Sequence, residues 1–206
     1  MIKLGFYLIH NPELIIWIEI LKLRLFFSIW LLLPSYGIAE GAFGIEFGSQ
    51  LTDTTPIPDV AGLFEISPEK PNEAFESYAV IYEPSLGVCK ITANTAINSN
   101  DGFGKKAVRQ YEKIREELID LYGAGSKHEF MSANADLDDD DEFALSLHKD
   151  ARIHSTLWAV LSPAIYSATA NVSLDIKAIK DSTWVNVSYE STFFSECMEK
   201  IKTQLD

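Results

Sequence analysis

The most acidic stretch of the chain is NADLDDDDEF at positions 134–143, which holds five aspartates and a glutamate in ten residues. Its carboxylates alternate as the calcium ligands of an EF-hand loop do, which makes Asp136, Asp138 and Asp140 a candidate calcium site. An EF-hand loop also requires glycine at its sixth position and a bidentate glutamate at its twelfth. Counted from Asn134 or from Asp136, neither position holds the required residue. A weak calcium site is therefore kept only as an alternative.

A second interpretation of the acidic run comes from the short helix that EFALSLHKD predicts directly after it. Adjacent carboxylates repel one another and stay hydrated, and the N-terminal end of a helix favours negative charge. We therefore interpret residues 132–142 as a solvated acidic connector. It would join two halves, 40–124 and 143–206, of a single domain at 40–206.

The histidines and glycines form no catalytic or cofactor-binding pattern. His128, His148 and His154 contain no H-E-x-x-H pair for zinc, and no serine stands in a G-x-S-x-G turn. DGFGK at 101–105 precedes a helix but lacks the spacing of a phosphate-binding loop. The sequence thus predicts no cofactor and no catalytic residue. The rival from the enzyme class is a hydrolase that uses carboxylates and His154.

Charge excludes some partners. The 206 residues include 17 basic and 30 acidic side chains, which give a net charge of -13. A surface of this sign repels phosphate groups, so we expect neither nucleic acid nor an anionic membrane surface as a partner. The apolar fraction of 47% is typical of a folded globular domain.

Residues 1–39 predict a secretory signal. The uncharged run LFFSIWLLL is followed by PSYGIAEG, whose small residues favour cleavage after Ala39. A retained membrane anchor is the alternative, but Glu19, Lys22 and Arg24 interrupt every apolar window long enough to span. The leader is long, which leaves open a start further downstream. We expect a periplasmic or secreted protein with no membrane span after cleavage.

Two cysteines, Cys89 and Cys197, are present in the exported part. An even number of cysteines in an oxidising compartment favours a disulfide bond. Closing a loop of roughly 100 residues would stabilise the fold by about 4 to 5 kcal/mol. Two buried free thiols are the alternative.

The first half of the domain predicts three strands and a helix. The strands are AGLFEIS, ESYAVIYEP and GVCKITANT, and alternation in the last places Cys89 on one face with Ile91 and Ala93. The helix covers 101–125, with Asp101 as its N-cap and Gly123 at its C-terminal end.

The second half predicts the same order. Its strands are RIHSTLWAVLS, NVSLDIKAIKD and STWVNVSYES, the last two forming an antiparallel hairpin. The C-terminal helix, STFFSECMEKIKTQLD, places Cys197 on its apolar stripe, toward the core that Cys89 faces. We predict an α+β fold, with an antiparallel sheet and two longer helices packed on one face. A βββα pseudo-repeat would describe both halves.

Two tryptophans are candidates for a recognition surface. Trp184 stands on the polar side of its strand and Trp158 lies in a neighbouring strand, and aromatic residues are enriched where partners bind. The alternative is that both cover the second sheet face against loops.

Several short segments resemble a family of uncharacterised exported bacterial proteins of about this length. In chain order they are GAFGIEFG, FESYAV, GVCKI, DGFG, LYG, LHKDARIHSTLW and VNVSYES, the last followed by a cysteine. The resemblance implies a cell-envelope location and the two cysteines as matching landmarks. It implies no activity and no catalytic residue. The run DLDDDDE departs from the family, where a less acidic segment with an aromatic residue is expected.

These observations favour an exported, non-catalytic binding or interaction module. It would act through its sheet face or sheet edge on an unknown protein or small molecule of the cell envelope. An enzyme would instead show a concave pocket where His154 and a carboxylate converge with polar partners.

Overall fold

The computed structural model describes residues 41–206 except 53–54, 59, 133–141, 160–167 and 205–206, and all of these belong to one compact unit, Ile38–Asp206. The leader at 1–39 and the candidate calcium ligands Asp136, Asp138 and Asp140 lie outside the described residues. No helix in the described ranges has the length and hydrophobicity needed to cross a membrane.

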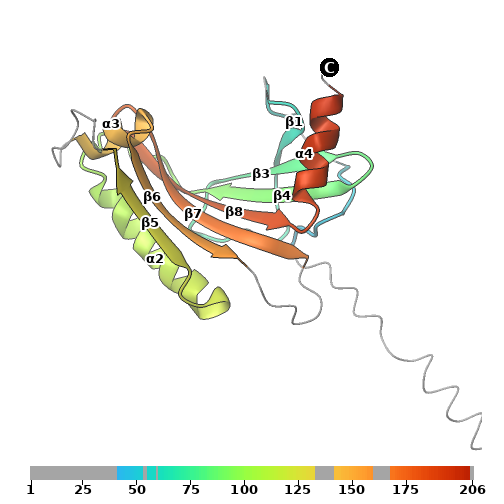
Figure 1. Ribbon diagram of the computed structural model, residues 1–206, viewed down its shortest axis with the longest axis horizontal. Coiled ribbons are helices and arrows are strands. Elements are labelled where there is room, and N and C mark those ends of the chain that lie inside the picture. Colours follow the sequence, from blue (N-terminus) through green and yellow to red (C-terminus); the bar gives the residue numbers. More distant parts are fainter. Residues whose placement is uncertain (1–40, 53–54, 59, 133–141, 160–167, 205–206) are drawn as a thin grey trace, which may run out of the picture. The chain divides into compact units, whose positions relative to one another are not determined.

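The fold is α+β, as predicted (Figure 1). One antiparallel sheet contains all the strands that the structure describes, in the order β1-β2-β3-β4-β8-β7-β6-β5. The strands are β1 (Thr55–Pro56), β2 (Leu63–Ile66), β3 (Ser77–Glu83), β4 (Gly87–Asn94), β5 (Ser126–Met131), β6 (Arg152–Ala159), β7 (Thr169–Ile179) and β8 (Ser182–Ser191). The helices are α2 (Lys105–Tyr122), α3 (Phe143–His148) and α4 (Phe194–Thr203).

The order βββα occurs twice in the chain, first as β2-β3-β4-α2 and again as β6-β7-β8-α4. The two three-stranded parts meet in the middle of the sheet, where β4 pairs antiparallel with β8. β5 and α3 lie between the two parts in the sequence, and β5 adds an edge strand beside β6.

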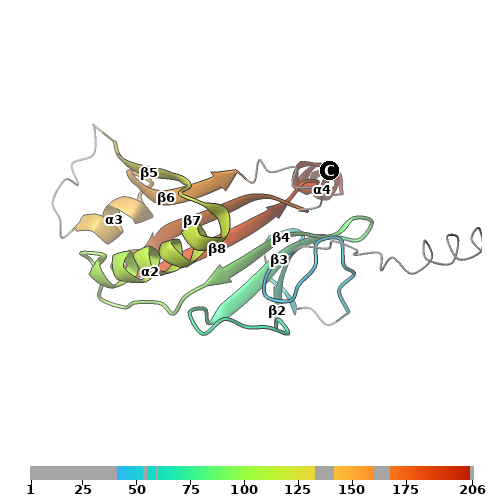
Figure 2. The same cartoon turned by 90° about the horizontal axis from the view of Figure 1, so that it is seen from below.

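α2 covers one face of the sheet. Ala107, Tyr111, Ile114 and Leu118 recur at helical spacing and are buried, and the helix packs against β7 and β8 (Figure 2). Burying each large apolar side chain stabilises the fold by about 1.5 to 3 kcal/mol. The strands contribute Tyr78, Val80, Ile91, Ala93, Val172, Leu174, Ile176, Val185, Val187 and Tyr189 to this main core.

The start of α2 is held by Asp101, which is 5% exposed. Its carboxylate accepts hydrogen bonds from the backbone N–H groups of Lys106 and Ala107, at 3.1 Å for the closest contact to each. It also accepts a 2.7 Å bond from the Thr183 hydroxyl on β8. Asp101 therefore satisfies free N–H groups of the first turn and ties the helix to the sheet, but it is not the N-cap residue that the sequence predicted. The N-cap position itself is Gly104, whose φ of 67° is costly for other residues.

α4 packs against β3 and β4, on the opposite side of the sheet from α2 (Figures 1 and 2). The arrangement thus differs from the prediction of two longer helices on one face. The cause lies in β4, where Tyr82 pairs with Val88 and Ile81 with Lys90, so that Cys89 is an extra residue without a partner on β3. Such a β-bulge interrupts the alternation of side chains.

The bulge places Cys89 on the α4 side, away from the main core that contains Ile91 and Ala93. The predicted disulfide between Cys89 and Cys197 is present, and both residues are fully buried in a separate small cluster with Ile201. The prediction that Cys89 shares a face with Ile91 and Ala93 is therefore wrong.

Polar contacts also fix α4. The Lys90 ammonium lies 5.2 Å from the ring centre of Phe194. The Glu83 carboxylate accepts hydrogen bonds from Ser85 and, at 3.1 Å, from the Gln204 side chain just after α4. The Ser85 hydroxyl is the main cause that lowers the pKa of Glu83 below its usual value.

Candidate functional site

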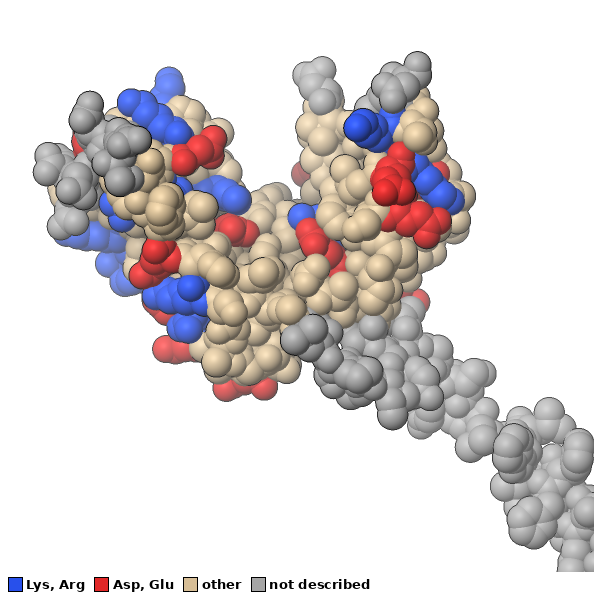
Figure 3. Space-filling view, viewed as in Figure 1, with Lys and Arg blue, Asp and Glu red and all other residues tan. Residues whose placement is uncertain are grey.

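The sheet face on the α4 side is polar over β4, β8 and β7, and we call it the open face. Among the described elements, α4 packs on this face at β3 and β4. The side chains of Asn94, Asn186, Ser173 and Asp175 are only partly buried there. In the space-filling view, the surface is hollowed between the part that carries α4 and the part that carries α3 (Figure 3).

The strand register aligns polar residues across the open face. Asn94 pairs with Ser77 on one side and with Asn186 on the other. Asn186 pairs with Asp175, which pairs with Ser155, which pairs with His128. We call the resulting line across six strands, which contains no apolar side chain, the polar row: Ser77, Asn94, Asn186, Asp175, Ser155 and His128.

A second line of polar residues runs parallel to the polar row, two residues away on each strand. Thr92 pairs with Ser188, and Ser188 pairs with Ser173. The hydroxyl oxygens of Thr92 and Ser188 are 3.3 Å apart, within hydrogen-bonding distance. Over β4 and β8, the centre of the open face therefore consists of neutral amides and hydroxyls, and Asp175 lies next to Asn186 on β7.

The amides of the polar row orient one another. Asn186 donates from Nδ2 to Oδ1 of Asn94 at 2.7 Å, and Ser188 donates to Oδ1 of Asn186 at 3.2 Å. Asn94 in turn donates from Nδ2 to the Ser77 hydroxyl at 3.3 Å. A primary amide has two N–H donors and an oxygen with two lone pairs. With these contacts among the described residues, each amide keeps one N–H and one lone pair for a further partner.

The charged side chains that β4, β8 and β7 present on this face form pairs. Lys90 lies 3.0 Å from Glu190, and Lys177 lies 3.8 Å from Asp175. Asn171 adds a hydrogen bond to Glu190. These pairs offset one another, so the open face carries little net charge although the whole chain is acidic.

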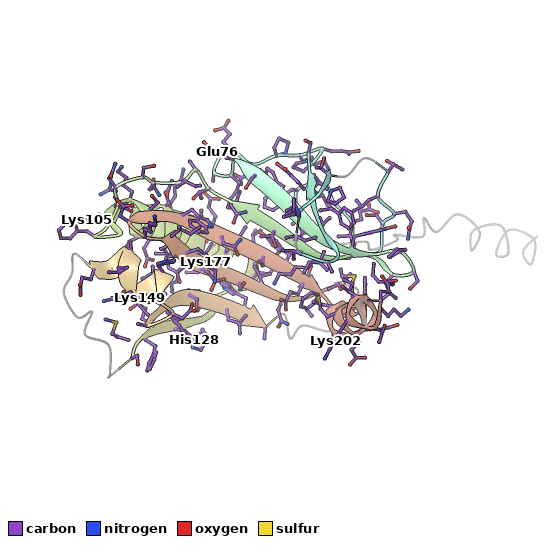
Figure 4. The ribbon with its side chains drawn as sticks, turned by 90° about the horizontal axis from the view of Figure 1, so that it is seen from above. Glu76, Lys105, His128, Lys149, Lys177 and Lys202 are labelled. Atoms are coloured by element: carbon purple, nitrogen blue, oxygen red, sulfur yellow. A yellow bond between two sulfur atoms is a disulfide. The ribbon has the colours of Figure 1, made fainter. Side chains whose placement is uncertain are left out.

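A pocket of about 240 Å³ lies at the α3 end of the open face. Leu147, His148 and Asp150 line it from α3 and the turn after it, and Lys177 and Trp184 line it from β7 and β8. Figure 4 looks onto the open face and shows Lys177 beside α3, with His128 at the β5 side and α4 at the opposite end. Trp184 is partly exposed at this pocket.

The structure separates the two tryptophans that the sequence put forward together. Trp184 lies on the open face, where β8 pairs it with Lys177. Trp158 is only 3% exposed, belongs to the main core, and donates a 2.7 Å hydrogen bond to the Gly123 carbonyl at the end of α2. Trp158 is therefore not part of an exposed recognition surface.

His154 lies on the face that α2 covers and is 9% exposed. Its ring contacts Tyr111, with centres 4.6 Å apart, and Phe143, at 6.0 Å. Its Nδ1 is 3.4 Å from a Glu129 carboxylate oxygen, whereas Nε2 is buried without a hydrogen-bond partner among the described residues. Burial lowers the pKa of His154, although Glu129 opposes the shift. The neutral form of His154 therefore predominates at pH 7.

This environment supports a structural role for His154 better than a catalytic role. A general base needs a hydroxyl, thiol or water within hydrogen-bond reach. The nearby hydroxyls of Tyr111 and Thr156 bond to each other instead. His154 does line the α3 pocket, together with Asp150 and Asp175, but its Nδ1 faces Glu129.

The described residues contain no group of three histidine, cysteine or acidic side chains that could hold a metal ion. His148 and His154 line the same pocket, whereas His128 lies apart on the β5 edge strand.

The fold and the open face define a single-sheet α+β protein with one face covered by a helix and the other partly open. Comparison with protein-family models, curated proteins and solved structures gives no match. Any function must therefore be argued from the face itself.

Proposed function

We propose that the protein is an exported binding module of the bacterial cell envelope, and that it binds its ligand on the open face. The observation that carries the proposal is the pair Asn94 and Asn186. Asn186 donates a hydrogen bond to Asn94, and Ser77 and Ser188 hold the two amides from either side. Among the described residues, each amide keeps one donor and one lone pair without a partner. Groups that are oriented before binding lose less entropy when a ligand arrives. A sheet face that only needed solvation would gain nothing from such ordering.

The disulfide supports the exported location. Disulfides persist in oxidising compartments and are rare in the bacterial cytoplasm, and Cys89 is bonded to Cys197. Two measurements test export directly. N-terminal sequencing of the mature protein should begin at Glu40, and thiol labelling without reductant should leave both cysteines unmodified. A mature protein that keeps residues 1–39, or that labels fully without reductant, contradicts this part of the proposal.

Binding at the open face is tested by nuclear magnetic resonance on the mature protein, titrated with a digest of bacterial envelope material. The amides of β4, β7 and β8 around Asn186 should shift. Asn186→Arg, which places a bulky cation in the polar row, should abolish the shifts, whereas Ala124→Arg adds the same charge in the exposed turn after α2 and should not. Shifts confined to the α2 side would contradict the proposal.

The same titration separates the binding module from the hydrolase. A hydrolase would release products from the digest at a rate that His154→Gln lowers. A binding module releases none.

A further inference from the structure

We propose that the ligand of the open face is a neutral, hydroxyl-rich chain, that is, an uncharged glycan lying across the strands along the polar row with one sugar ring against Trp184. The inference rests on the proposed function and names the chemical class of its ligand. It is carried by the charge of the face, the hydrogen-bonding capacity of the amides and the position of the tryptophan.

Charge is the first argument. Lys90 and Glu190 form one ion pair on the open face, and Lys177 lies 3.8 Å from Asp175. A ligand with net charge would have to compete with one member of each pair, and would lose the energy of its own dehydration. A neutral polar ligand competes with neither pair, and its dehydration costs less than that of a charged group. The face is therefore complementary to an uncharged partner.

Hydrogen-bonding capacity is the second argument. Within the described part of the chain, Asn94 and Asn186 each keep one N–H donor and one lone pair, side by side on neighbouring strands. A hydroxyl group donates one hydrogen bond and accepts others, so neighbouring hydroxyls on a sugar ring match a donor and acceptor on one amide. Thr92 adds a partly buried hydroxyl two residues before Asn94 on β4. The Ser188 hydroxyl is buried and orients Asn186 instead.

Trp184 supplies the third argument. A sugar ring has an apolar side formed by its C–H groups, and this side packs on the face of an aromatic ring. Trp184 lines a pocket of about 240 Å³, which is smaller than the 300 to 1,000 Å³ of pockets for drug-sized ligands. The pocket therefore suits a single sugar ring of the chain, which would lie beside Asn186 and Asp175 in the middle of the polar row.

The length and direction of the polar row fit a chain better than a single small molecule. The row crosses six strands, from Ser77 to His128, and neighbouring strands lie about 4.8 Å apart, so it extends over about 24 Å. The strand spacing is close to the length of one sugar unit in an extended glycan. Successive sugar units can thus meet equivalent positions on successive strands.

A peptide ligand is the alternative, and the geometry of the face does not favour it. An extended peptide binds to a sheet mainly through backbone hydrogen bonds at an edge strand. The polar row lies on the face, where β4, β7 and β8 already use their backbone groups in the ladder. A peptide there would leave many of its own N–H and C=O groups without partners.

The test adds matched pairs of probe ligands to the mature protein in the same nuclear magnetic resonance titration. Chitopentaose is neutral, and its deacetylated form carries the same backbone with positive charge. Oligogalacturonate is an anionic chain. An uncharged peptide of similar length tests the alternative that the open face binds a peptide. We expect chitopentaose or a second neutral probe, maltopentaose, to shift the amides of the open face, with weaker binding of both charged chains.

Variants test the site. Trp184→Ala and Asn186→Ala should each weaken binding of the neutral chain by about tenfold, which corresponds to the loss of one good contact. Phe103→Ala removes an aromatic ring that is 52% exposed in the loop before α2 and should leave binding unchanged. Thermal unfolding of each variant checks that it folds. Thr92→Val keeps the size of its side chain and serves as a second variant if Asn186→Ala unfolds.

Three results would overturn the inference: no shift with either neutral glycan, tighter binding of a charged chain, or shifts of the open face by the peptide alone. If envelope digest still shifts the open face while both neutral glycans do not, the glycan inference fails and the proposed function stands. If the digest is silent as well, both fail.

Discussion

Cys89 and Ile91 stand two residues apart on β4, yet their side chains lie on opposite faces of the sheet. Ile91 packs in the main core under α2, and Cys89 is bonded to Cys197 under α4. The β-bulge at Cys89 is the cause, since it adds one residue between the pairs of Val88 and Lys90. The bulge thereby lets one strand contribute to the main core on one face and to the disulfide cluster under α4 on the other.

The first prediction concerns this disulfide. Replacing both cysteines by serine should lower the free energy of unfolding by about 4 to 5 kcal/mol, because the bond closes a loop between residues 108 apart. Urea denaturation of the oxidised wild type and of Cys89→Ser/Cys197→Ser measures the difference. Wild type in reductant should match the double variant. Equal stability of the oxidised and reduced proteins would show that the bond does not stabilise the fold.

The second prediction concerns Asp101. Asp101→Ala should destabilise the protein by about 2 to 3 kcal/mol, because two N–H groups of α2 and the buried Thr183 hydroxyl lose their acceptor. Asp101→Asn keeps one acceptor oxygen and should cost less. Asp120 is an exposed acid near the end of the same helix, and Asp120→Ala should change stability by no more than about 0.5 kcal/mol. A similar loss in both alanine variants would argue against the cap.

Alternation and helical spacing were enough to predict most of this fold. They indicate β3, β4, β7, β8 and the long helix, because each buries one side and exposes the other. They miss β5, SKHEFM, because five of its six residues are exposed and neither face of the strand is buried. Only its backbone hydrogen bonds to β6 make it a strand. They also miss the bulge, since Cys89 is apolar enough to be buried on either face.

The candidate site was only partly predictable. The sequence indicates which residues of each strand point to the polar side, including Trp184 and Asn186. It does not reveal that Asn186 lies beside Asn94, 92 residues away in the chain, because strand pairing across the sheet depends on the whole fold. The two sides of β6 look alike in sequence, since each mixes apolar and polar residues. Its buried side, which holds Trp158 with Thr156 and His154, was therefore not evident.

The third prediction concerns the buried hydroxyl pair Tyr111 and Thr156. Both residues are fully buried, and their hydroxyls bond α2 to β6. Tyr111→Phe should cost about 1 to 3 kcal/mol of stability, because it leaves the Thr156 hydroxyl buried without a partner, and Thr156→Val should cost a similar amount. The double variant removes both polar groups and should cost less than the sum. A double-mutant cycle by urea denaturation measures the coupling, and strictly additive losses would contradict it.

The fourth prediction is a pH dependence of stability that comes from His154. Burial lowers the pKa of His154 in the folded protein below its ordinary value of 6.5. As the pH falls through 6.5, the unfolded chain therefore binds a proton that the folded protein does not. The stability that His154 contributes is fully present above that pH and is lost below it, at no more than about 1.4 kcal/mol per pH unit.

Urea denaturation between about pH 8 and pH 5 measures this loss. This range stays above 4.5, the ordinary pKa of Glu129, whose folded pKa is lowered chiefly by a hydrogen bond from Lys127 and whose own loss of stability occurs at lower pH. His154→Gln should be less dependent on pH in this range, because glutamine does not titrate. His128→Gln, at an exposed position on β5, should keep the wild-type slope. If the two variants respond alike, the protonation of His154 is not what destabilises the fold in mild acid.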